Sequence, residues 1–61
     1  MQRDGKKRII QAAQRLIAQR GVEKTSMRDI AEEAGITTGA IYYYYKSKED
    51  LLYEVMDYAM A

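Results

Sequence analysis

The chain has 61 residues, which allows one small domain with a modest core and marginal stability. It contains no Cys, His, Pro, Trp or Phe, which excludes disulfides, the usual zinc sites and the usual acyl-transfer nucleophile–base pairs. No apolar run approaches the roughly 20 residues of a membrane span, and the start of the chain lacks a signal-peptide pattern. These features predict a cytoplasmic, all-α protein that is not an enzyme and needs no metal or cofactor.

The charges are unevenly distributed, although the net charge is only +1. Residues 1–31 carry eight basic and three acidic side chains, a net charge of +5. Residues 32–61 carry two basic and six acidic side chains, a net charge of −4. This asymmetry favours a surface that binds an anionic partner, although the solvated faces of ordinary helices can produce the same counts.

The first helix is expected over about residues 4–20. Its apolar side chains recur at helical spacing and are Ile9, Ala13, Leu16 and Ile17, flanked by Ile10 and Ala12. Asp4 fits the N-cap position, and Gly21 fits the left-handed position that ends a helix. Val22 is then placed to fold back on the last turn, as in a Schellman motif.

A short second helix is expected over residues 27–34. Ser26 and Asp29 have the spacing of a capping box at its start, and Gly35 ends it. Its apolar stripe consists of Met27, Ile30, Ala31 and Ala34. A helix of this length is unstable alone, so it must be held by packing against the others.

The third helix is expected over residues 38–44, with Thr37 as its N-cap. The run of four tyrosines, residues 42–45, favours a strand by intrinsic propensity. No second strand is available to complete its hydrogen bonds, so a helix is the better interpretation. Ile41 and Tyr45, four residues apart, then form its inward face.

A fourth helix is expected over residues 48–61, with a second capping box from Ser47 and Asp50. Its apolar residues are Leu51, Leu52, Val55, Met56 and Ala59. Neither Gly, Asn nor Pro ends this helix before Ala61, which suggests that the chain is a fragment or that its last helix ends against something absent.

The second and third helices form a candidate helix-turn-helix motif. Ala31 is small enough for the helices to cross closely, Gly35 supplies a positive φ for the turn, and Ile41 anchors the later helix in the core. An ordinary helical hairpin would fit this spacing equally well. The outward face of the third helix favours the helix-turn-helix interpretation.

This outward face is unusually aromatic for a small domain. With Ile41 inside, the exposed residues are Thr38, Gly39, Tyr42, Tyr43 and part of Tyr44. Tyrosine hydroxyls can donate to phosphate oxygens, and a bare Gly39 backbone permits close approach of a duplex. The alternative is that the tyrosines are core or protein-contact residues, as we expect for Tyr45.

Residues 25–51 closely resemble the DNA-binding region of the tetracycline-repressor (TetR) family of bacterial transcription regulators. The string Gly39-x-Ile41-Tyr42-x-x-Tyr45-Lys46-Ser47-Lys48-Glu49-x-Leu51 is its most specific part. Residues 9–21 resemble the first helix of the family, and the resemblance covers about residues 6–56. It implies a homeodomain-like, three-helix helix-turn-helix domain over residues 1–61, with the start of a fourth helix.

The resemblance also implies which residues contact operator DNA, with residues 38–44 as the recognition helix in the major groove. Phosphate contacts are implied for Tyr42, Lys48, Thr25, Ser26 and Thr37. Contacts at or beside base edges are implied for Arg28, Thr38, Gly39, Ala40 and Tyr43, and Tyr44 also belongs to this surface. Arg28 would suit guanine, and the Ala40 methyl group would suit thymine.

Family members carry a further helical domain that binds a small-molecule inducer and forms the homodimer, and no such domain is present in this sequence. The resemblance implies a ligand-released repressor that binds a palindromic operator in the cytoplasm. The sequence departs from the family at Tyr45, where Phe is common, and at Tyr44, where His is frequent. The Tyr45 hydroxyl must therefore find a partner or stay at the edge of the core.

Other functions fit the sequence less well. The apolar stripe of the last helix, together with the tyrosines, would suit a protein-interaction module. Adjacent carboxylates such as Glu32 and Glu33 do not face each other across a cleft, which argues against an enzyme. Acidic Glu54 and Asp57 beside the last apolar stripe argue against membrane-surface binding.

Overall fold

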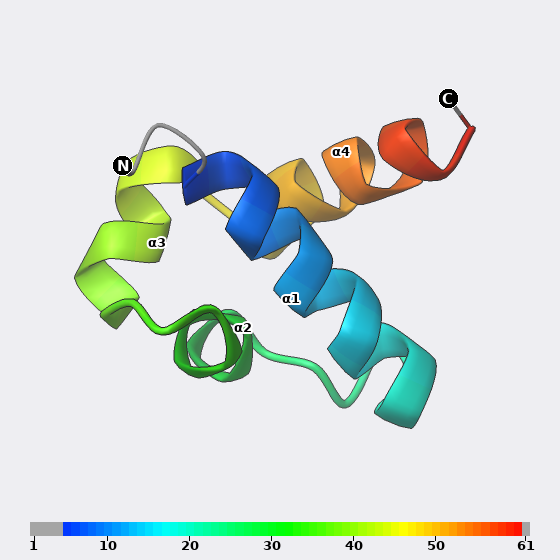
Figure 1. Cartoon of the computed structure of the whole chain (residues 1–61), viewed down its shortest axis with the longest axis horizontal. Coiled ribbons are helices and arrows are strands. Elements are labelled where there is room, and N and C mark those ends of the chain that lie inside the picture. Colours follow the sequence, from blue (N-terminus) through cyan, green and yellow to red (C-terminus); the bar gives the residue numbers. More distant parts are fainter. Residues whose placement is uncertain (1–4, 61) are drawn as a thin grey trace.

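The computed structural model describes residues 5–60, with side chains up to Asp57. In this part of the chain it contains four helices and no strand (Figure 1). They are α1 (Gly5–Arg20), α2 (Met27–Ala34), α3 (Thr38–Tyr44) and α4 (Lys48–Met60). The expected all-α fold is confirmed. The proposed N-cap Asp4, the Ala59 side chain and the last residue, Ala61, lie outside the described part.

Helix α1 lies at the centre of the molecule and packs mainly against α2 and α4 (Figure 1). Helix α3 packs mainly on α2, at the edge of the molecule. One continuous core joins the four helices. It consists of Ile9, Ile10, Ala12, Ala13, Leu16, Met27, Ile30, Ala31, Ala34, Ile41, Tyr45, Leu51 and Val55. The apolar stripes read from the sequence therefore meet one another.

Helix α1 ends at Arg20, and the φ of 86° at the following Gly21 confirms the expected left-handed position. The Gly21 N–H donates to the Ile17 carbonyl over 2.8 Å, which is the single bond of the αL motif. Val22 remains exposed instead of folding back on the last turn. The Schellman ending expected here is therefore wrong.

The Schellman motif is found instead at the end of α2. Gly35 has a φ of 77°, and the Ile36 N–H donates to the Ala31 carbonyl over 2.9 Å. Arg8 of α1 adds a side-chain cap, since its guanidinium donates to the Ala34 carbonyl over 2.8 Å. The turn between α2 and α3 is thus fixed by its own backbone and by α1.

The expected N-caps of α2 and α3 are confirmed. The Ser26 hydroxyl accepts from the Asp29 N–H over 3.0 Å, and the Asp29 carboxylate accepts from the Ser26 N–H over 3.1 Å. This is the complete capping box. The Thr37 hydroxyl accepts from the Ala40 N–H over 3.0 Å, which starts α3 as a helix.

Helix α4 begins after Ser47, whose hydroxyl accepts from the Asp50 N–H over 3.2 Å. Of its expected apolar stripe, Leu51 and Val55 are buried in the core against α1, whereas Met56 is exposed. Helix α4 is therefore an integral part of the domain, and only part of its apolar surface remains uncovered.

Candidate nucleic-acid interface

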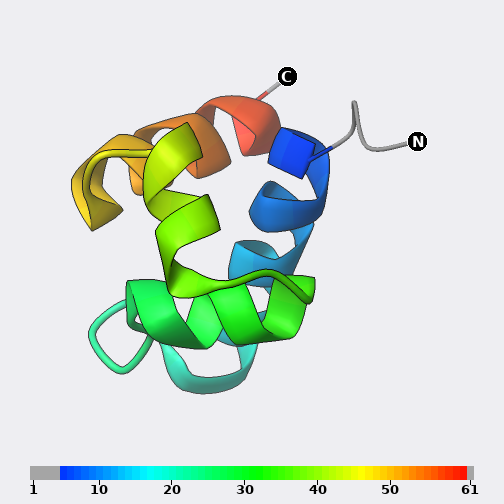
Figure 2. The same ribbon diagram turned by 90° about the vertical axis from the view of Figure 1, so that its left-hand side faces the viewer.

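Helix α3 stands on α2 and turns its other side to solvent, as Figure 2 shows from the face that carries α3. Ala31 is buried where the two helices meet, and Ile41 is fully buried in the core below α3. Together with the Gly35 turn, these contacts give the helix-turn-helix geometry that the spacing indicated.

The outward face of α3 carries two exposed tyrosines. Tyr42 is 47% exposed and Tyr43 is 86% exposed, whereas Tyr45 is only 4% exposed. Thr38 and Gly39 in the first turn are also exposed, and the neighbouring Ala40 is half-buried. The tyrosine run is thus divided as the helical interpretation requires, with phenol groups available to a partner on one side.

Tyr44 is half-buried and packs against the core, so it contributes less to this face than Tyr43 does. The rings of Tyr43 and Tyr44 meet edge-to-face with their centroids 5.5 Å apart. Tyr44 also lies against Gly5, where an added Cβ would stand 2.8 Å from the ring carbon Cζ. A larger residue at position 5 would therefore displace the Tyr44 ring.

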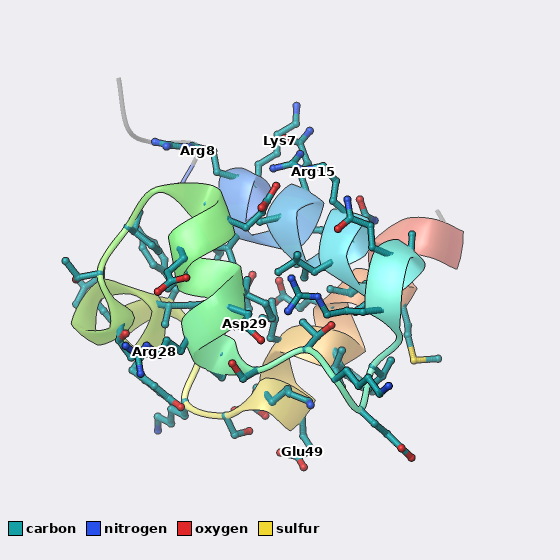
Figure 3. All side chains as sticks on the ribbon, turned by 90° about the horizontal axis from the view of Figure 1, so that it is seen from below. Lys7, Arg8, Arg15, Arg28, Asp29 and Glu49 are labelled. Carbon is teal, nitrogen blue, oxygen red and sulfur yellow. The ribbon has the colours of Figure 1, made fainter. Side chains whose placement is uncertain are left out.

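Arg28 extends from the first turn of α2 into solvent, away from α1 (Figure 3). It forms an ion pair with Glu32 at 3.8 Å, and both side chains are more than two-thirds exposed. Exposed pairs of this kind contribute about 0.3–0.5 kcal/mol, so the guanidinium can leave Glu32 for a better acceptor.

Thr25 and Lys48 lie differently from the other expected contact residues. Thr25 is 1% exposed, and its hydroxyl donates to the Gly21 carbonyl over 2.8 Å. The Lys48 ammonium donates to the carbonyls of Val22 and Thr25 over 2.9 and 2.8 Å. No sequence signal indicated this contact between α4 and the loop before α2, because it joins residues 26 and 23 positions apart.

The hydroxyls of Ser26 and Thr37 cap their own helices, yet both residues are exposed. A hydroxyl that accepts from a backbone N–H still has its own proton to donate. Both residues can therefore cap a helix and contact a phosphate oxygen at the same time. They lie at the first turns of the two helices of the motif, where free backbone N–H groups also favour anions.

Two arginines of α1 form ion pairs with α2. Arg15 pairs with Glu33 at 3.0 Å and Arg20 with Asp29 at 3.4 Å, which joins α1 to α2. Figure 3 shows Arg15 on the α1 side and Arg28 at the opposite edge of α2. The charge asymmetry therefore serves packing of α1 on α2 as well as any anionic partner.

Asp29 shows the electrostatic consequence of the α2 cap. The Ser26 backbone N–H, followed by the Ser26 hydroxyl, holds the pKa of the Asp29 carboxyl below its ordinary value of 3.8. Arg20 and Arg28 lower this pKa further, while desolvation opposes them. The carboxylate is thus charged at neutral pH and favourably placed at a helix N-terminus.

No helix among the described residues has both the length and the apolar character needed to cross a membrane. The same part of the chain contains no cluster of three or more acidic, His or Cys side chains that could hold a metal ion. The described residues best suited to bind a partner are therefore the exposed polar and aromatic side chains of α3 and of the first turn of α2.

Comparison with known proteins identifies the domain. A family model described as "Bacterial regulatory proteins, tetR family" matches residues 9–55, which is most of the chain. The chain belongs to the TetR family. TetR-family regulators bind DNA through an N-terminal helix-turn-helix domain, and they are not enzymes.

Several curated TetR-family relatives are similar to this chain. The HTH-type transcriptional regulators TtgR of Pseudomonas putida and AcrR of Shigella flexneri are each 47% identical over 49 residues. The HTH-type transcriptional repressor KstR2 of Mycolicibacterium smegmatis is 44% identical over 48 residues. These alignments cover 79–80% of this chain and 23% of each relative, so the chain spans about a quarter of their length. No solved structure gives a significant match.

Proposed function

We propose that residues 1–61 form the DNA-binding domain of a bacterial TetR-family transcription regulator and bind an operator duplex with α3 in the major groove. The observation that carries this proposal is the exposed face of α3, held on α2 by a fixed turn. A rigid helix that presents hydroxyls and rings to solvent can enter a groove about 12 Å wide without rearrangement.

The proposed contacts fall into two groups. Tyr42, Ser26, Thr37 and Lys48 would bind phosphate oxygens and set the orientation of α3 on the duplex. Thr25 is buried and would hold the Lys48 side chain in place, since its carbonyl accepts a hydrogen bond from the Lys48 ammonium. The residues proposed to lie at base edges are Arg28, Thr38, Gly39, Ala40 and Tyr43, with Tyr44 supporting Tyr43 through their ring contact.

The whole protein is proposed to be a cytoplasmic repressor that acts as a homodimer on a palindromic operator and is released by a small-molecule inducer. Its dimer contacts and inducer site are proposed to lie in a further helical domain after residue 61. The support is that relatives such as TtgR, AcrR and KstR2 are about three and a half times as long as this chain. A second half-site would raise affinity through effective concentration, so the 61-residue chain alone should bind weakly.

The experiment is selection of bound duplexes from a random pool, followed by salt titration with the enriched duplex. We expect Tyr42→Phe to weaken binding about fivefold, because one phenol–phosphate hydrogen bond is lost. Tyr53→Phe is the matched control, since it removes a hydroxyl from a side chain that is 80% exposed on α4. Failure to enrich any duplex, or equal effects of the two substitutions, would contradict the proposal.

A second candidate is a protein-interaction surface on α4, favoured by the exposed Tyr53 and Met56. It is compatible with DNA binding, since Tyr53 and Met56 are not among the residues proposed to contact DNA. A partner that protects Tyr53 while the chain fails to respond to any duplex would favour this candidate over the first.

A further inference from the structure

Tyr45 is the C-cap residue of α3. It is buried in the core, yet charged side chains lie at its hydroxyl and its ring. Its ring is 4% exposed, and its hydroxyl donates to Glu54 Oε1 of α4 over 2.9 Å. The Lys6 ammonium of α1 lies 5.5 Å from the centre of the same ring, within the range of a cation–π contact. One tyrosine therefore meets side chains from two other helices.

This contact matters because α3 and α4 share little other packing. Helix α3 packs mainly on α2, and α4 packs mainly on α1. An open groove of about 400 Å³ lies between them, and its lining includes Lys6, Tyr44, Tyr45, Asp50, Tyr53 and Glu54. Where side chains do not fill the space between two helices, a hydrogen bond across it has more influence on their relative position.

The proposed DNA surface uses both helices. Tyr42 lies on α3, whereas Lys48 is the first residue of α4, so their phosphate contacts require α3 and α4 to keep one relative position. A misplacement of about 1 Å is enough to lose a hydrogen bond, because hydrogen-bond distances span only about 0.5 Å.

We infer that Tyr45 and Glu54 are positioning residues that hold α3 and the start of α4 in the arrangement that DNA binding requires. Lys6 supports the pair from α1 through the Tyr45 ring. The inference rests on the proposed function for its DNA readout. Neither residue itself contacts DNA: Tyr45 is buried, and the Glu54 carboxylate would repel a phosphate.

The test is Tyr45→Phe, which keeps the ring in the core and removes only the hydroxyl. We expect affinity for the selected duplex to fall about fivefold to tenfold, since the lost bond has a charged acceptor at a partly exposed site. We also expect a shallower salt dependence, because a phosphate contact at the start of α4 is lost. Affinity should be measured well below the unfolding temperature of the variant, after circular dichroism has established that the variant is folded.

Glu54 variants and controls separate positioning from simple stability. Glu54→Gln retains an acceptor oxygen and should keep most of the affinity, whereas Glu54→Ala should match Tyr45→Phe, and the double variant should be no weaker than either. Tyr53→Phe and Asp57→Ala, at exposed positions of α4, should stay within about twofold of the unmodified chain. Lower thermal stability with unchanged affinity and salt dependence would overturn the inference.

The free protein provides a readout that does not depend on DNA. In NMR spectra, Tyr45→Phe should shift backbone amides throughout residues 38–44, because the orientation of α3 changes. Shifts confined to the immediate neighbours of Tyr45 and Glu54 would overturn the inference. If the unmodified chain binds no duplex, the proposed function fails, and these amide shifts still decide whether the pair positions α3.

Discussion

The Lys48 ammonium nitrogen lies 2.8 Å from the Thr25 carbonyl oxygen and thereby joins the start of α4 to the loop before α2. The same ammonium group donates a second hydrogen bond to the Val22 carbonyl over 2.9 Å. An ammonium group has three N–H donors, so this arrangement leaves one for a phosphate oxygen. Lys48 can thus serve structure and binding together.

Replacing Lys48 with Met should therefore have two effects. Loss of two partly exposed charge-assisted bonds should cost about 1 kcal/mol, which lowers the melting temperature by about 4–8 °C in a domain of this size. Loss of a phosphate contact should reduce the slope of log affinity against log salt by about one. Thermal unfolding and salt titration measure the two effects separately. An unchanged salt slope with a lower melting temperature would assign Lys48 to structure alone.

Replacing Arg28 with Lys tests base recognition. A guanidinium can donate two bonds to guanine, whereas an ammonium acts as a point charge, so discrimination at one base pair should fall by about 1–3 kcal/mol. Competition with duplexes altered at single positions measures this loss. Arg15→Lys is the control, since Arg15 pairs with Glu33 on the α1 side. Equal specificity of the Arg28 variant and the unmodified chain would contradict a base contact.

The lowered pKa of the Asp29 carboxyl predicts how the stability of the domain depends on pH. Because its folded-state pKa lies below the ordinary value of 3.8, its ionised form stabilises the fold above that pH. This stabilisation should disappear as the pH falls below the ordinary value and through the folded-state pKa. Urea unfolding across the acid range should show a smaller pH dependence for Asp29→Asn. The same pH dependence for Asp29→Asn and the unmodified chain would contradict the prediction.

Gly5→Ala tests the contact between α1 and Tyr44. Alanine stabilises the middle of a helix by about 0.5–1 kcal/mol relative to glycine, and the gain is smaller at position 5, the first residue of α1. Here the new Cβ would stand 2.8 Å from Tyr44 Cζ, so the ring must move or the helices must separate. We expect Gly5→Ala to be less favourable in the unmodified background than in a background where Tyr44 is replaced by Ala. Unfolding free energies of the four variants check this; the same gain in both backgrounds would rule out the steric contact.

Local sequence signals predicted most of the fold. The capping box at Ser26, the N-cap at Thr37 and the positive φ at Gly35 all depend on residues close together in the chain, and all three are confirmed. The buried position of Tyr45 followed from its spacing with Ile41. The absence of a strand partner also led correctly to a helix where propensity favoured a strand.

Contacts between distant residues could not be predicted in this way. The bonds of Lys48 to the loop before α2, of Arg8 to the end of α2, and of Tyr45 to Glu54 depend on how helices pack. The Schellman motif predicted at the end of α1 was wrong for a related reason. Val22 suits this motif by residue type alone, but it remains exposed. The DNA contacts themselves remain predictions, since they depend on a partner.

The tyrosine run also has a consequence for how the sequence can change. Four identical neighbours carry no register information of their own, so which tyrosine is buried depends on its spacing from fully buried Ile41. Loss of one tyrosine would place Lys46 four residues after Ile41, in the position where Tyr45 is buried at the end of α3. A charged side chain would then have to enter the core or α3 would have to rotate, so the number of tyrosines in the run is constrained by packing as well as by their chemistry.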